Sequence, residues 1–114
     1  MEFAVQEKSF QFAIRIVNLC KYLREEKKEY ILTKQLLRSG TSIGANVAEA
    51  QQAQSKSDFV HKMNIALKET VETNYWLRLL TATDYLDNRA SESIIFDCEE
   101  LVKLLTAIVR TAKE

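Results

Sequence analysis

Hydrophobic positions recur every three or four residues through most of the chain, which is the spacing of amphipathic α-helices. The pattern predicts four helices, over residues 5–24, 33–53, 58–82 and 91–112, joined by short polar connectors. The last has the clearest apolar stripe, formed by Ile94, Cys98, Leu101, Leu105 and Ile108. Four helices of this length with short connectors favour an all-α fold, an antiparallel up-down-up-down four-helix bundle that forms one domain over residues 1–114.

The first predicted helix carries two neighbouring apolar series with polar residues opposite them. One series is Phe10, Ala13, Ile14, Val17 and Cys20, and the other is Phe12, Ile16, Leu19 and Leu23. The charged connector that follows, residues 24–30, is expected to be a solvated turn. Thr33 and Ser57 are the residue types that cap helix N-termini, and we expect them to begin the second and third helices.

The second predicted helix contains both glycines of the chain, Gly40 and Gly44. A glycine inside a helix costs about 1 kcal/mol relative to alanine, so the pair indicates that another segment approaches closely. Its apolar stripe is Leu36, Ile43, Val47 and Ala50. The opposite stripe is mostly small residues, Ser42 and Ala45, between Arg38 and Glu49. A helix face that is exposed to solvent does not require small residues, so we expect another segment to pack against this stripe as well.

The third predicted helix is apolar nearly all round. Its first series is Phe59, Met63, Ala66, Thr70 and Leu77, and Ile65, Trp76 and Leu79 lie on the far side together with Glu72. In a small bundle a helix normally has a polar outer face, so the additional apolar face of this helix predicts self-association. The candidate oligomer interface is therefore Arg38, Ser42, Ala45, Glu49, Ile65, Glu72, Trp76 and Leu79.

The short connectors allow neighbouring helices to be aligned by height. Arg38 falls level with Glu72 or Thr73, and Glu49 falls level with Lys62. We expect these charges to lie close together, within one chain or across a subunit contact, as structural salt bridges rather than a catalytic pair.

Because the chain has no net charge, any binding of nucleic acid must depend on a local patch of basic residues. The 16 basic and 16 acidic residues cancel, whereas a dedicated nucleic-acid binder usually has a basic excess. The candidate phosphate contacts are Arg24, Lys27, Lys28, Lys34, Arg38, Lys56, Lys62 and Arg78. A solvated surface of mixed charge is the alternative for each of them.

Other classes of function find little support in the sequence. The two cysteines, Cys20 and Cys98, fit no metal-binding spacing and are expected to be buried thiols in a reducing compartment. His61 is the single histidine, whereas a di-iron bundle needs two Glu-x-x-His motifs. The start of the chain is interrupted by charges, unlike a signal peptide, and no apolar run reaches the length of a membrane span. We therefore expect a cytoplasmic protein that is not an enzyme, with no cofactor, no metal, no small-molecule substrate and no membrane contact.

The stretch LLRSGTSIGANVAEA, residues 36–50, followed by DFVHKMNIALKETVETNYWL, residues 58–77, resembles the 23S rRNA-intervening sequence proteins, also called S23 proteins. Two departures stand in the second helix, where the family commonly has proline at the position of Gly44 and glycine at that of Ala50. In the third helix Lys68 and Glu69 replace a usual small pair. The matching residues are Leu37, Arg38, Ser42, Ile43, Ala45, Asn46, Val47, Ala48 and Glu49, and in the third helix Phe59, Ala66, Glu72, either Tyr75 or Trp76, and Leu77.

The resemblance implies a four-helix bundle that assembles as a homopentamer. Accessory proteins of diversity-generating retroelements belong to the same group and bind nucleic acid and a reverse transcriptase, so the resemblance implies RNA or a nucleoprotein as a partner. The residues leave open a second reading, a protein–protein interaction module that binds no nucleic acid, because self-association and partner binding use the same apolar surface.

Overall fold

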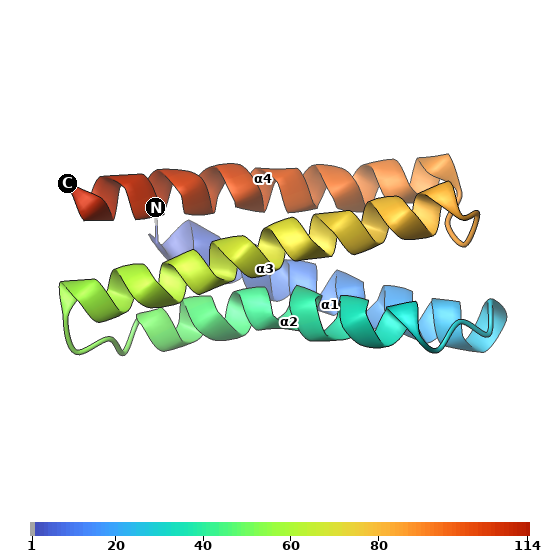
Figure 1. Cartoon of the computed structure of the whole chain (residues 1–114), viewed down its shortest axis with the longest axis horizontal. Coiled ribbons are helices and arrows are strands. Elements are labelled where there is room, and N and C mark those ends of the chain that lie inside the picture. Colours follow the sequence, from blue (N-terminus) through green and yellow to red (C-terminus); the bar gives the residue numbers. More distant parts are fainter. Residues whose placement is uncertain (1) are drawn as a thin grey trace.

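The computed structural model describes residues 2–114, with side chains from Phe3 onward, as an elongated bundle of four α-helices (Figure 1). The helices are α1 (Glu2–Glu26), α2 (Leu32–Ala50), α3 (Lys56–Ala82) and α4 (Asn88–Lys113). Consecutive helices run antiparallel, so the α1–α2 and α3–α4 connections share one end of the bundle (Figure 1). The α2–α3 connection and the C-terminus lie at the other end. The predicted all-α four-helix bundle is confirmed.

Each helix contributes one apolar stripe to a common core. The stripes predicted for the second and fourth helices are buried throughout, which confirms both. Burial of side chains of this size stabilises the fold by about 1.5–3 kcal/mol each. The largest fully buried aliphatic side chains include Ile16 and Leu23 of α1, Leu36 and Ile43 of α2, Met63, Leu77 and Leu80 of α3, and Leu101 and Leu105 of α4.

The close approach predicted from the glycines is present between α1 and α2. A Cβ atom on Gly40 would lie 2.8 Å from Cγ1 and Cγ2 of Ile16, and one on Gly44 would lie 3.3 Å from the carbonyl oxygen of Ser9. These positions let the backbones of α1 and α2 come together, and the contact buries the α1 side that carries Ile16. Of the two apolar series of α1, the core therefore takes Phe12, Ile16 and Leu23, together with Cys20, and the remaining series points outward.

Two predicted helix caps are wrong by about half a turn. Ser55, not Ser57, caps α3, because its Oγ accepts a hydrogen bond of 3.0 Å from the backbone N–H of Asp58. Thr33 lies inside the first turn of α2, which begins after Ile31 without a side-chain cap at that residue. Helix α2 also ends at Ala50, three residues before the predicted end.

The first connector is not wholly solvated. Glu29 is only 7% exposed, and its Oε1 accepts a hydrogen bond of 2.9 Å from the backbone N–H of Thr33. The carbonyl oxygen of Glu29 accepts a second bond, from Oγ1 of Thr33, also at 2.9 Å. A carboxylate at a helix N-terminus satisfies an unpaired N–H and suits the helix dipole. Glu29, which lies in the connector, thus caps α2 in place of Ile31, whose side chain cannot accept a hydrogen bond.

Candidate interaction surfaces

An exposed apolar surface runs along the outside of α1. Phe10 is 61% exposed, and Phe3, Ile14 and Val17 are exposed beside it at helical spacing. Phe10, Ile14 and Val17 belong to the first apolar series of α1, from which the core takes Cys20. Apolar side chains of this size are usually buried, so their alignment on one outer face is unusual for a single subunit.

A groove between α1 and α2 extends this apolar surface. It has a volume of about 390 Å³, and its walls include Phe10, Ala13, Gly44, Ala45 and Ala48. The candidate interface residue Ala45 therefore faces this groove and is exposed. We call the whole area the α1/α2 surface, made of Phe3, Phe10, Ile14, Val17, Ala45 and Ala48.

The charged interface candidates form ion pairs along the outside of α2 and α3. Arg38 pairs with Glu72 and, at 3.3 Å, with Glu69, while Lys62 pairs with Glu49 at 2.9 Å. The predicted proximity of Arg38 to Glu72 and of Glu49 to Lys62 is confirmed, and both pairs lie within one chain. The hydrogen bond from Lys62 to Glu49 raises the pKa of that lysine.

The uncharged interface candidates lie between or beside these ion pairs. Ser42 is partly buried and its Oγ donates to the carbonyl oxygen of Arg38 at 2.6 Å. Ile65 and Leu79 are half-buried, as is Trp76, whose Nε1 donates to Oε2 of Glu72 at 2.9 Å. A single subunit therefore covers these apolar side chains in part and leaves part of each in water.

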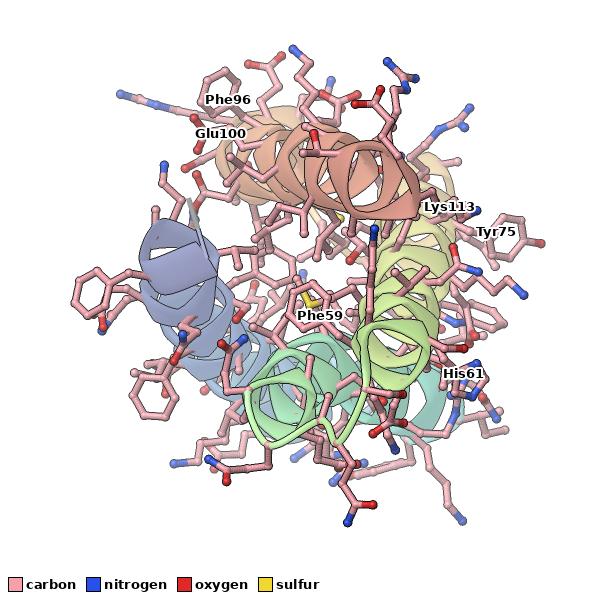
Figure 2. The ribbon with its side chains drawn as sticks, turned by 90° about the vertical axis from the view of Figure 1, so that its left-hand side faces the viewer. Phe59, His61, Tyr75, Phe96, Glu100 and Lys113 are labelled. Atoms are coloured by element: carbon pink, nitrogen blue, oxygen red, sulfur yellow. The ribbon has the colours of Figure 1, made fainter. Side chains whose placement is uncertain are left out.

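The largest apolar exposure on α3 lies farther round the helix, at Val71 and Tyr75. Tyr75 is 57% exposed and points away from the bundle (Figure 2). Between α3 and α4 lies a groove of about 350 Å³, lined by Val71, Asn74 and Val102 together with Glu99 and Lys103. We call the area formed by Val71, Asn74, Tyr75 and Val102 the α3/α4 surface.

Sequence reasoning did not identify Asn74 as unusual. Its Oδ1 is buried and accepts no hydrogen bond from any part of the chain that the structure describes. Buried polar atoms are nearly always paired, so this unpaired acceptor, on a residue that lines the groove, is unusual. No sequence signal marks it, because the atom is buried by tertiary packing.

The eight candidate phosphate contacts do not form one patch. Arg38 and Lys62 are ion-paired, and Lys56 lies at the start of α3 with its Nζ 3.1 Å from a main-chain oxygen of Glu114. Acidic residues, among them Glu25 and Glu26, accompany the remaining candidates at the far end of the bundle. Those remaining five, which lie at the end formed by the α1–α2 and α3–α4 connections, are Arg24, Lys27, Lys28, Lys34 and Arg78.

Both cysteines are buried free thiols, as predicted. Burial raises the pKa of Cys20 to about 11, against a smaller opposing effect of Arg24, and burial raises the pKa of Cys98 to about 12. The thiol of Cys98 donates to the carbonyl oxygen of Thr70 at 3.4 Å. Both groups are therefore protonated at neutral pH, the unreactive form of cysteine.

The rest of the described chain offers few other sites. His61 is exposed (Figure 2), and residues 2–114 contain no cluster of three or more His, Cys, Asp or Glu side chains arranged to hold a metal ion. Among the same residues, no helix has the length and apolar character needed to cross a membrane.

Comparison with known proteins identifies the family of the chain. The family model described as 23S rRNA-intervening sequence protein matches residues 1–107. A crystal structure of a protein with unknown function from the S23 ribosomal protein family of Bacteroides thetaiotaomicron VPI-5482 is 55% identical, with a TM-score of 0.94. The similarity covers 96% of this chain and 97% of that one, while comparison with curated proteins gives no match. The chain therefore belongs to the 23S rRNA-intervening sequence protein family.

Proposed function

We propose that this chain is a non-catalytic bundle that self-associates and serves as a scaffold for RNA or a nucleoprotein. The observation that carries the proposal is the α1/α2 surface, where three residues at helical spacing, Phe10, Ile14 and Val17, face water in a single bundle. Covering such a surface with another subunit removes apolar area from water and stabilises the assembly. The family resemblance implies five copies, and we adopt that number for the proposed assembly.

The non-catalytic part of the proposal rests on the chemistry of the grooves and of the charged groups. The α1/α2 groove is lined mainly by apolar and small residues, its polar members are Gln6 and Thr41, and no acidic or basic side chain lines it to act on the Thr41 hydroxyl. The carboxylates of Glu49 and Glu72 are occupied by Lys62 and Arg38, in exposed pairs of the kind that orient side chains at a surface. Both thiols are buried and protonated.

Self-association is tested by the solution mass of the purified protein. Sedimentation equilibrium at micromolar concentration is expected to give a whole-number multiple of the chain mass, with five copies as the expected value. A species of one chain mass with native helical content would contradict the proposal. It would favour the second reading, in which a different protein covers the α1/α2 surface.

The RNA part of the proposal rests on the basic residues at one end of the bundle. Lys27, Lys28 and Lys34 are exposed there and make no ion pair within the described chain. Lysine neutralises phosphates irrespective of base sequence, and several parallel copies would bring many such side chains to one side of the assembly. A chain without net charge would in this way present a basic edge.

A titration at several salt concentrations tests this part. Affinity for structured RNA is expected to fall linearly on a logarithmic scale as salt rises, because bound phosphates release counterions. Duplex DNA serves as the competitor. An affinity that salt does not change, or no binding at low salt, would remove RNA from the proposal and leave the oligomeric scaffold standing.

A further inference from the structure

We infer that copies of this chain associate head-to-tail: the α1/α2 surface of one copy packs against the α3/α4 surface of the next. The inference rests on the proposed self-association and adds which two surfaces meet. They are different surfaces, so the contact is heterologous and repeats from copy to copy. It differs from a two-fold dimer, in which one surface meets itself.

The two surfaces lie on opposite sides of the molecule. Helices α1 and α3 are diagonal members of the bundle, with α2 and α4 between them (Figure 2). Tyr75 points outward from the α3 side in that view. One chain therefore cannot cover its own exposed surfaces, whereas a second copy always brings the surface that the first one lacks.

The two surfaces also lie at the same height along the bundle. Ile16 of α1 contacts Gly40 of α2, and the adjacent Ser39 accepts a hydrogen bond of 2.9 Å from Oγ1 of Thr73 on α3. Ile16 and Thr73 thus share a level, and α1 and α3 run in the same direction. At about 1.5 Å per residue, Ile14 and Val17 lie within roughly one helical turn of Val71 and Tyr75. Side-by-side copies with parallel axes therefore bring the surfaces together without sliding along the axis.

Charges beside the two surfaces favour the parallel arrangement. On α1, Glu7 and Lys21 flank the apolar residues, with Glu7 nearer the start of the helix. The ion pair of Arg15 with Asp97 fixes the register of α4 against α1. By that register Lys103 lies toward the level of Glu7, and Glu92 lies near the level of Lys21. Parallel copies place opposite charges together, whereas antiparallel copies would place like charges together. Two charges do not follow this pattern: Arg78, near the level of Lys21, and Glu99, which lines the α3/α4 groove.

The shapes of the two surfaces agree with this pairing. The α1/α2 groove has small residues, Gly44, Ala45 and Ala48, which allow a neighbouring helix to come close. The α3/α4 surface presents the projecting ring of Tyr75, which a groove with small walls can accommodate.

Two charge variants, one on each surface, test the inference. Ala45→Lys blocks the α1/α2 surface and Tyr75→Glu blocks the α3/α4 surface, and both sites are exposed, so the fold should persist. The matched control is Thr111→Lys, which adds the same charge at an exposed position of α4 that belongs to neither surface. Circular dichroism and thermal unfolding verify the fold of each variant, and sedimentation velocity measures its assembly.

Each single variant is expected to weaken assembly at least about tenfold, while Thr111→Lys assembles as the wild type does. An equimolar mixture of Ala45→Lys and Tyr75→Glu is expected to form a one-to-one dimer, because each retains the surface that the other has lost. A mixture that stays monomeric would overturn the head-to-tail contact, as would dissociation caused by only one of the two substitutions or by Thr111→Lys alone. These results leave self-association standing, whereas a monomeric wild type would overturn both proposals.

Discussion

A side chain as small as a methyl group has no room at Gly40, because its Cβ would lie 2.8 Å from two carbon atoms of Ile16. Cβ atoms in proteins do not approach other carbons so closely, and Ile16 is fully buried. The distance between α1 and α2 is therefore set by the absence of a side chain at one position. This close packing of α1 against α2 also decides which apolar series of α1 enters the core and which faces outward.

We predict that Gly40→Ala destabilises the protein by up to about 2 kcal/mol. Alanine favours the helix by about 1 kcal/mol, but overpacking a core costs about 1–3 kcal/mol, and the β-branched Ile16 has little rotamer freedom with which to retreat. Chemical denaturation measures the difference. Gly44→Ala is the matched control on the same helix, since its Cβ would meet the carbonyl oxygen of Ser9 at 3.3 Å. It is expected to stay within about 1 kcal/mol of the wild type, and equal effects of the two substitutions would contradict the assignment.

The buried carboxylate of Glu29 gives a second prediction. Glu29→Ala removes the acceptor for the backbone N–H of Thr33 at the start of α2, a loss worth about 1–2 kcal/mol by analogy with helix caps. The change in the midpoint of urea unfolding measures it. Glu25→Ala, in the same charged stretch but exposed, should change stability by no more than about 0.5 kcal/mol. If both substitutions had the same small effect, Glu29 would be no more than a surface residue.

Much of the fold could be predicted from periodicity, because burial in a bundle repeats with the helical turn. The stripe of Leu36, Ile43 and Val47 and the level of Arg38 with Glu72 follow from spacing and short connectors alone, and both are present. The family motif in α2 and α3 likewise predicted the family that the comparisons show.

The rotation of α1 could not be predicted in the same way. Both of its apolar series recur at helical spacing, so periodicity cannot say which one faces the core. The contact of Ile16 with Gly40 decides it, and that contact joins residues 24 positions apart. The cap from Glu29 and the unpaired acceptor of Asn74 also depend on tertiary positions, which a charged stretch or a lone amide in the sequence does not show.

The two buried thiols predict a loss of stability at alkaline pH. The pKa of Cys20 is about 11 and that of Cys98 about 12 in the folded chain, above the ordinary value of 9.0. The folded state thus holds its thiol protons where the unfolded state releases them. Stability is unaffected below about pH 9 and falls as pH rises from there through the folded pKa values, by at most about 1.4 kcal/mol per pH unit for each thiol.

Urea unfolding at pH 8, 9 and 10 measures this effect of pH on the free energy of unfolding. The double variant Cys20→Ala, Cys98→Ala lacks both thiols and is expected to lose less stability between pH 9 and pH 10, although its absolute stability is lower. All other titratable groups are present in both proteins, so their contribution cancels in the comparison. The same pH dependence in the variant and the wild type would show that the thiols do not contribute.

The basic end of the bundle gives the prediction most specific to the proposed function. Replacing Lys27, Lys28 and Lys34 with glutamine is expected to lower the slope of log affinity for RNA against log salt by about 2, since each phosphate contact contributes about 0.7–0.9. The matched control replaces Lys8, Lys68 and Lys113, which are not among the candidate phosphate contacts and lie away from that end, and makes the same change in net charge. Sedimentation must show that both triple variants assemble as the wild type does. If the control lowers the slope by the same amount, RNA responds to overall charge rather than to this end, and the location of the site is wrong.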